Sequence, residues 1–275
     1  MRDLKKESGL SVYLKDDFKL DLDIKLLGGE FSARTISDMT KVIKDKIKIN
    51  NDPLYYMYRD VHERIDDEKI KSSGLRYDIT VILPRMLGSE FNKTYGHYHP
   101  LKDGTDLTYP EVYEVISGMA LCLLQKMGKN EDELDEIYLV EVKSGEKIIM
   151  PPNFGHITIN PLSVPLVMSN WVAAEFSSEY ELYEKNHGGG YYITKSQIPN
   201  PKSQINSNFQ IAKNKHYKIL PKLIKARPKE LKQFALDFGK PLYSSGSKNI
   251  GKFNFLVYPE KFGNAISPQT VFVFE

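Results

Sequence analysis

The stretch KTYGHYHP, residues 93–100, places two histidines two residues apart in a segment that has the composition of a β-strand. Side chains two residues apart on a strand point to the same face, so His97 and His99 can aim both imidazoles into one interior while Tyr98 points away. Two such histidines can also be buried imidazoles that bond to backbone carbonyl groups. The pair therefore predicts a metal site only if further ligands lie beside it in the fold.

Two later stretches supply the missing ligands. YPEVYEVISG, residues 109–118, offers the carboxylate of Glu111 on a predicted strand. GEKIIMPPNFGHITIN, residues 145–160, carries one strand into a Pro-Pro turn and begins the next strand at His156. Three imidazoles and one carboxylate suit a divalent first-row metal ion.

The composition fits a soluble globular protein. The chain has 275 residues, of which 41% are hydrophobic and 27% charged, enough for one large domain or one domain with an appendage. A single cysteine, Cys122, excludes an intramolecular disulfide and fits a reducing compartment. The N-terminus lacks an apolar signal segment, and no stretch approaches the ~18 apolar residues of a membrane span. We therefore expect a cytoplasmic protein.

From residue 54 onward the chain reads as many short strands separated by Gly, Pro, Asn and Asp. The predicted strands are LYYMYRDV (54–61), RYDITVIL (76–83), GHYHP (96–100), VYEVISG (112–118), LCLLQ (121–125), IYLVEV (137–142), EKIIMPP (146–152), HITIN (156–160) and PLVMSNWV (165–172). This pattern predicts a β-sandwich or barrel. Before it, residues 34–47 show the apolar spacing of a helix.

The charge divides the chain in two. Residues 195–250 contain twelve Lys and Arg against two acids, and the polar run QIPNPKSQINSN, residues 197–208, predicts a boundary. We expect one unit over residues 1–194 and a lysine-rich accessory region over residues 195–275. The lysines are scattered and few aromatic residues lie among them, which argues against a nucleic-acid surface.

The accessory region has a mixed pattern. We expect helices at KILPKLIKA (218–226) and PKELKQFALDFG (228–239), and strands at KFNFLVYP (252–259) and TVFVFE (270–275).

Together the histidines and glycines resemble the two cupin motifs, His-x-His with Glu-x6-Gly and then Gly-x5-Pro-x-Gly-x2-His-x3-Asn. Asn153 stands where the second motif usually has glycine, and asparagine tolerates the positive φ that such a position can require. The resemblance implies a mainly β cupin fold, a double-stranded β-helix or jelly-roll barrel. We expect it to carry an N-terminal extension and a C-terminal mixed α+β appendage.

Further segments resemble one branch, the cupin-type phosphoglucose isomerases. RTISDM, DPLYYMYR, RYDITVILP, LGSEFNKTYGHYHP, YPEVYEV, MPPNFGHITIN and GGGYY follow one another in that order over roughly residues 30–195. The resemblance implies a cytoplasmic, homodimeric isomerase of glycolysis and gluconeogenesis that interconverts glucose 6-phosphate and fructose 6-phosphate.

The resemblance also implies roles for individual residues. The metal ligands are His97, His99, Glu111 and His156, and Glu111 is also the candidate catalytic base. The residues that hold the sugar phosphate are Thr80, Thr94, Gly96 and Tyr113, with Tyr180 and Tyr56 (or Tyr55) lining the pocket. The cofactor is one divalent ion, Fe²⁺ first, with Mn²⁺, Ni²⁺ or Zn²⁺ able to substitute.

Two departures from the family pattern leave questions. Eleven residues separate His99 from Glu111, and this insertion contains Asp103 and Asp106 as alternative ligands, although the residues around Glu111 match better. A tyrosine expected after His156 is replaced near Val172.

Several functions stay open at this point. They are an isomerase of another sugar phosphate such as mannose 6-phosphate, a cupin oxygenase, and a non-catalytic sugar-phosphate-binding module. The sequence does not distinguish proton transfer from a hydride shift.

Overall fold

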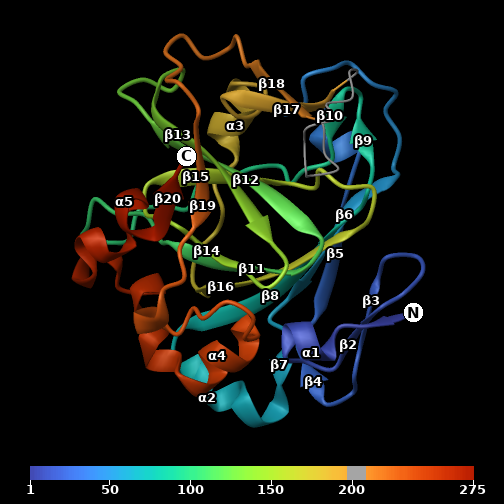
Figure 1. Ribbon diagram of the computed structural model, residues 1–275, viewed down its shortest axis with the longest axis vertical. Coiled ribbons are helices and arrows are strands. Elements are labelled where there is room, and N and C mark those ends of the chain that lie inside the picture. Colours follow the sequence, from blue (N-terminus) through green and yellow to red (C-terminus); the bar gives the residue numbers. More distant parts are fainter. Residues whose placement is uncertain (197–208) are drawn as a thin grey trace.

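The computed structural model describes residues 1–196 and 209–275, and its body is a β-barrel made from two large sheets (Figure 1). The first sheet contains, in spatial order, β14 (Lys147–Met150), β11 (Glu111–Ser117), β16 (Leu166–Ala173), β8 (Leu75–Ile82), β6 (Pro53–Arg59) and β5 (Glu30–Thr35). The second contains β15 (Phe154–Ile159), β12 (Met119–Met127), β13 (Leu134–Lys143), β19 (Ile224–Pro228) and β20 (Phe272–Phe274). Neighbouring strands are antiparallel except β13 and β19, which run parallel. The predicted mainly β cupin fold is confirmed.

A glycine allows the chain to pass from one sheet to the other. Consecutive strands β11 and β12 lie in different sheets, and Gly118 between them has a φ of +93°. A Cβ atom there would lie 3.2 Å from the carbonyl oxygen of Pro165, so a side chain would be both strained and crowded. Gly118 thereby fixes where β11 ends, and β11 begins with Glu111.

Smaller elements surround the barrel. The small sheets are β1 (Arg2–Asp3) with β2 (Val12–Leu14) and β3 (Leu20–Leu22), β4 (Leu26–Leu27) with β7 (His62–Glu63), and β9 (Met86–Leu87) with β10 (Glu90–Phe91), β17 (Tyr191–Lys195) and β18 (Phe209–Lys213). The α-helices are α1 (Lys5–Ser8), α2 (Asp67–Ser72), α3 (Glu181–Lys185), α4 (Leu242–Lys248) and α5 (Pro268–Val271). The N-terminal extension attaches to the barrel where Arg2 donates to the Ser117 hydroxyl and the Leu20 amide donates to the Tyr58 hydroxyl.

Residues after 208 contribute to the sheets. β18 pairs with β17, and β19 pairs with β13. The run 197–208, expected as a boundary, lies outside the described residues.

Five expectations for individual segments need correction or confirmation. Residues 34–47 hold only a short 3-10 helix, Ser37–Met39, and the two expected helices at 218–239 are replaced by β19 and the 3-10 helix Lys232–Phe234. Pro221 and Pro228 remove backbone donors that a continuous helix would need. The expected strand at 252–259 is a 3-10 helix, Ile250–Leu256, whereas the expected C-terminal strand is present as β20.

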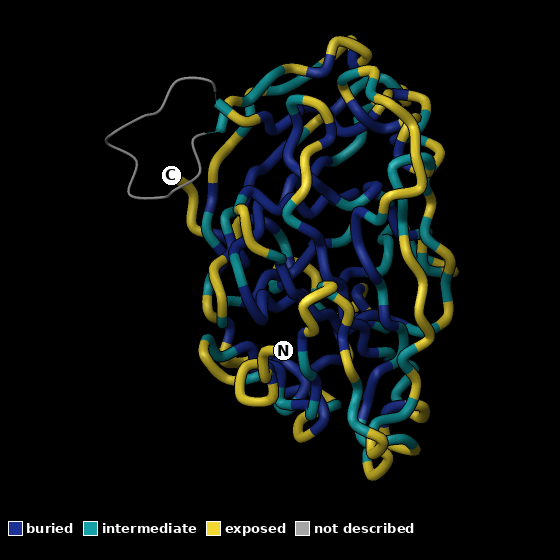
Figure 2. The backbone as a smooth tube through the Cα atoms, turned by 90° about the vertical axis from the view of Figure 1, so that its right-hand side faces the viewer, coloured by how far each residue is buried: buried dark blue, intermediate teal, exposed yellow. Residues whose placement is uncertain are grey.

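Burial is continuous through the barrel and beneath the C-terminal helices. Figure 2 shows the buried backbone concentrated inside the body, with exposed segments at its periphery. On the outer side of the first sheet, Trp171 and Tyr77 are fully buried and pack against Tyr243 of α4. Within the described residues, no helix is long and apolar enough to cross a membrane.

Candidate metal centre

Four side chains predicted as metal ligands converge in the barrel. His97, His99, Glu111 and His156 each present one ligand atom, and these atoms all lie within 4.8 Å of one another. Glu111 begins β11 and His156 lies on β15, so the two large sheets each contribute a ligand. The predicted strand at 96–100 is instead a segment held by isolated bridges, in which His97 pairs with His156.

The two histidines of the first motif face each other with their Nε2 atoms, 3.1 Å apart. The Nδ1 atom of His99 lies 2.7 Å from the carbonyl oxygen of Tyr109, so Nδ1 carries the proton and the Nε2 lone pair is free. Such an outer hydrogen bond is typical of a metal-bound histidine. Two nitrogens bound at about 2.1 Å and at right angles lie about 3 Å apart, which matches this separation.

Glu111 contributes an unsatisfied carboxylate oxygen. Its Oε2 lies 3.4 Å from Nε2 of His99 and 3.4 Å from Nε2 of His156, yet this buried atom makes no hydrogen bond. Burial alone would raise the pKa of Glu111, but the imidazoles of His156 and His99 hold that pKa well below its ordinary value. Burial lowers the pKa of His97 and of His156, so both stay neutral. An ionised carboxylate beside three imidazoles can hold a divalent cation.

The insertion after His99 does not bring its carboxylates to the centre. Asp103 and Asp106 are exposed and lie outside the cluster, so Glu111 is the carboxylate that converges with the histidines.

Asn153 fixes the insertion to the turn before β15. Its φ is +69°, which agrees with the expectation that asparagine replaces a glycine of positive φ. Its backbone amide donates to the Thr108 hydroxyl at 2.7 Å, and its side-chain oxygen accepts from the Thr108 amide at 2.9 Å. Since Tyr109 follows Thr108, this contact also positions the carbonyl group that orients His99.

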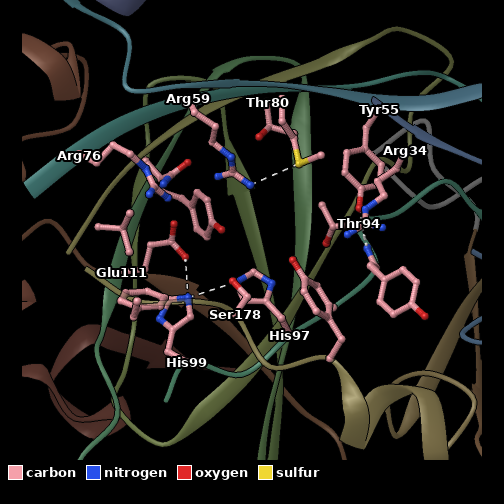
Figure 3. A pocket seen from close by; sticks show the side chains of 18 residues that line it. Arg34, Tyr55, Arg59, Arg76, Thr80, Thr94, His97, His99, Glu111 and Ser178 are labelled. Carbon is pink, nitrogen blue, oxygen red and sulfur yellow. Dashed lines mark hydrogen bonds and ion pairs between the residues drawn. The ribbon is translucent and has the colours of Figure 1, made fainter. Parts of the chain in front are cut away.

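The cluster forms one wall of a pocket that Figure 3 shows from close by. Most of the predicted substrate-binding residues line it, namely Thr80, Thr94, Gly96, Tyr113 and Tyr180. Gly96 has a φ of +88°, and a Cβ there would lie 2.7 Å from the Ile157 side chain. Burial raises the pKa of Tyr113 well above its ordinary value, so its phenol stays neutral, 3.2 Å from Nε2 of His156.

The prediction of Tyr56 as a pocket residue is wrong by one position. Tyr55 lines the pocket, and its hydroxyl accepts a hydrogen bond from the Tyr95 amide at 3.3 Å. Tyr56 lies on the opposite face of β6, where its ring packs against Phe31 at 5.6 Å between centroids. Adjacent residues of a strand point to opposite faces, so only one of the two tyrosines can enter the pocket.

Three arginines that sequence reasoning missed also line the pocket, Arg34, Arg59 and Arg76. The guanidinium of Arg34 lies 5.5 Å from the ring centroids of both Tyr95 and Tyr180. Burial works against the charge of Arg59, but Asp78, and after it Glu111, raises its pKa. For Arg59 and Arg76 the available signal was a charged residue within a predicted strand, whereas Arg34 lay in a segment expected to be helical.

Comparisons with known proteins identify a family for this chain. A family model described as glucose-6-phosphate isomerase (GPI) matches residues 33–210. The curated glucose-6-phosphate isomerase of Thermococcus litoralis is 27% identical over 168 residues, which cover 59% of this chain and 80% of that protein. The enzyme of the same name from Pyrococcus furiosus is 26% identical with the same coverage.

Solved structures resemble the chain more remotely. Oxalate decarboxylase from Bacillus subtilis has a TM-score of 0.31 and 17% identity over 45% of this chain and 27% of that one. Oxalate oxidase in complex with glycolate has a TM-score of 0.26 and 19% identity over 38% of this chain and 42% of that one. The family match covers well over half of the sequence and includes all four clustered ligands. The chain belongs to the glucose-6-phosphate isomerase (GPI) family.

Proposed function

We propose that this protein is a metal-dependent aldose–ketose isomerase that interconverts glucose 6-phosphate and fructose 6-phosphate. The observation that carries the proposal is the cluster of three imidazoles and one ionised carboxylate in the wall of a pocket rich in hydroxyl and guanidinium donors. Family membership supports the same reaction.

His97, His99, Glu111 and His156 would hold one metal ion per chain. Bound there, a divalent ion supplies Lewis acidity that polarises the carbonyl group of the open-chain sugar. Fe²⁺ is our first choice, and Mn²⁺, Ni²⁺ and Zn²⁺ are compatible with the same donors.

Glu111 is the proposed base. Because its pKa is held low, the carboxylate is ionised and can accept the C2 proton of the aldose. The C2–H electron pair then forms the C1–C2 double bond, and negative charge develops on O1. Return of the proton to C1, with transfer of the O2 proton to O1, gives the ketose.

The phosphate group would bind away from this chemistry. Thr80, Thr94 and the backbone amide of Gly96 line the pocket with Arg34, a set of donors suited to a phosphate dianion. The Thr94 hydroxyl accepts from the Thr158 amide at 2.9 Å, so its own proton remains available to the ligand. Holding the phosphate would orient C1 and C2 toward Glu111.

The test combines metal analysis with a coupled assay. Fructose 6-phosphate is converted, and glucose 6-phosphate is detected through NADPH formation by glucose-6-phosphate dehydrogenase. We expect activity that depends on a divalent ion, and His97→Ala or His156→Ala should remove metal and turnover together. A metal-loaded protein without turnover would favour a binding module instead, and turnover of only another sugar phosphate would reassign the substrate.

We also propose a homodimer that works in cytoplasmic glycolysis and gluconeogenesis. β5 is the edge of the six-stranded sheet, and its Phe31 is 48% exposed, so an unpaired edge with an apolar side chain is available to a second copy. Light scattering at micromolar concentration should give twice the chain mass, and Phe31→Glu should shift the mass toward the monomer. The mass of a monomer for the unaltered chain would contradict this assignment.

A further inference from the structure

One buried carboxylate fixes two of the pocket arginines. The side chain of Asp78 on β8 is 1% exposed, and its oxygens accept from Nη1 of Arg59 at 2.6 Å and from Nε of Arg76 at 3.0 and 3.1 Å. The backbone amide of Asp60 donates to the same carboxylate at 2.9 Å. Two guanidinium groups therefore share one compensating charge and are held rigidly at the pocket wall.

The sheet register places Arg59 between the two halves of the proposed substrate site. Three successive rows cross the strands: Glu111, Val172 and Arg76; then Tyr113, Asn170 and Asp78; then Met168, Thr80 and Met57. Rows lie about 7 Å apart, since a strand rises about 3.4 Å per residue and every second residue faces inward. Arg59 joins the middle row through its ion pair with Asp78. The middle row lies between the metal ligand Glu111 and the phosphate-side residue Thr80.

The guanidinium group of Arg59 is available to a ligand. Figure 3 shows it pointing into the pocket from the wall opposite His97. Its Nη2 lies 3.4 Å from the sulfur of Met57, which is a weak acceptor that a ligand oxygen would replace favourably. The Asp78 ion pair limits the freedom of the side chain, so little conformational entropy is lost when a ligand binds.

The neighbouring wall lacks a hydroxyl group at the position where one was expected. Val172, in the row of Glu111, lines the pocket where the family resemblance implied a tyrosine. A valine leaves space and offers no donor to a sugar oxygen. The nearest inward cationic donors on the adjoining strands are those that Asp78 holds.

We propose that Arg59 is an additional catalytic residue, which contacts the oxygens near C1 and C2 and stabilises the negative charge that develops on them. This inference rests on the proposed function. Asp78 acts as a positioning residue, because its carboxylate accepts from Nη1 of Arg59 and leaves the other donors of that guanidinium free for a ligand. When Glu111 takes the C2 proton and the electron pair moves toward O1, the oxyanion forms in a pocket that already contains a fixed positive charge. No proton leaves Arg59 in this step, since a guanidinium group stays protonated.

The test separates charge stabilisation from binding. Arg59→Met and Arg59→Lys are compared with Arg85→Met, a control on the surface whose arginine is 40% exposed and pairs with Asp52. For Arg59→Met we expect kcat to fall about 100-fold to 1000-fold, the effect of removing one donor to an oxyanion. KM for fructose 6-phosphate and the metal content should change less than threefold. Arg59→Lys should recover part of kcat because it keeps the charge but not the fork.

Calorimetry gives a second readout that does not depend on turnover. The probes are a five-carbon aldonic acid phosphate, whose carboxylate imitates the charged intermediate, and a hexitol phosphate, which has no charge at C1 or C2. Arg59→Met should weaken binding of the aldonic acid phosphate at least tenfold and leave the affinity for the hexitol phosphate unchanged. Should Arg59→Met fail to fold, Arg59→Lys is used for the same comparison. It should then bind the aldonic acid phosphate more weakly and the hexitol phosphate as tightly as the unaltered chain does.

Other outcomes distinguish a failure of the Arg59 inference from a failure of the proposed function. If Arg59→Met keeps kcat within threefold, or if both probes weaken equally, Arg59 is a structural residue and the inference is wrong. If the unaltered, metal-loaded chain does not isomerise fructose 6-phosphate, the proposed function fails instead. In that case preferential loss of the acid probe would still identify Arg59 as an anion-binding residue.

Discussion

At the scale of single residues, the site depends on the face of the strand or segment to which each side chain points. His97 and His99 share a face and both reach the cluster, whereas Tyr55 and Tyr56 are adjacent and only Tyr55 reaches the pocket. The His-x-His spacing fixes relative direction, and the two imidazoles do lie in one cluster, as that spacing predicted. Nothing in YY fixes which tyrosine points inward, because that depends on where β6 begins and on its partner strands.

Glu111 and Asp103 provide the sharpest test of the metal ligand. Glu111→Gln replaces an ionised ligand with a neutral amide, so we expect metal content to fall at least tenfold and turnover to be lost. Asp103→Asn should retain both, because Asp103 is exposed and outside the cluster. Metal analysis of the two purified variants, followed by the coupled assay, checks this prediction. The reverse pattern would show that the insertion delivers the carboxylate in solution.

The two tyrosines make a matched pair of variants. Tyr55→Phe removes a hydroxyl that faces the pocket and should raise KM for fructose 6-phosphate about fivefold, the effect of losing a hydrogen bond worth about 1 kcal/mol. Tyr56→Phe should leave KM unchanged, since Tyr56 packs against Phe31 on the other face. Steady-state kinetics of both variants show which of the two tyrosines contacts the substrate. If only Tyr56→Phe changed KM, Tyr56 and not Tyr55 would be the tyrosine that faces the pocket.

At the scale of elements, patterns of alternation predicted strands well and predicted the C-terminal helices poorly. Every predicted strand of the barrel except 96–100, which forms only isolated bridges, is present, because period-2 alternation and turn residues act locally. The segment FNFLVY has the composition of a strand but forms a 3-10 helix whose Phe253, Phe255 and Leu256 are all buried. Burial on several sides removes the need for alternation, so tertiary packing decided the structure of this segment.

A buried ion pair connects three of these elements and makes stability depend on pH. The Nζ atom of Lys147 on β14 donates to Glu114 on β11 at 2.8 Å, and the Leu242 amide at the start of α4 donates to the same carboxylate at 2.7 Å. Burial raises the pKa of Glu114 to about 7 from its ordinary value of 4.5. The folded state therefore binds a proton more readily than the unfolded state between these two values.

The sign of the effect follows from this difference. The contribution of Glu114 to stability is fully present below pH 4.5 and is lost as the pH rises to about 7. Urea unfolding at pH 5 and pH 7.5 should show a smaller pH dependence for Glu114→Gln than for the unaltered chain. Equal pH dependence of the two proteins would remove Glu114 from this role.

At the scale of the whole molecule, charge and composition separated the last eighty residues, but the structure attaches them to the barrel. β19 extends the second sheet, and Lys102 of the insertion forms an ion pair with Glu260 at 2.9 Å. The Nε1 atom of Trp171 donates to the Leu242 carbonyl at 3.2 Å. A sequence read locally cannot show such pairings, because each partner lies far away along the chain. We still propose that residues 195–275 act as an accessory region, since the lining of the metal pocket comes from residues before 195.

If residues 195–275 are an accessory region, changes in them should lower stability without lowering turnover. Truncation at residue 195 uncovers Trp171 and Tyr77 and should reduce solubility and melting temperature, while any folded fraction keeps its metal and turns over fructose 6-phosphate. A milder variant, Gly246→Leu, brings its Cβ into collision with the Trp171 indole and should lower the melting temperature by roughly 5 °C. Gly251→Ala enters open space and should leave the melting temperature unchanged. Both variants should retain kcat below their melting temperatures, because α4 covers the outer face of the sheet and the pocket opens on the inner one. A folded, metal-loaded truncation that has lost turnover would instead place part of the catalytic machinery beyond residue 195.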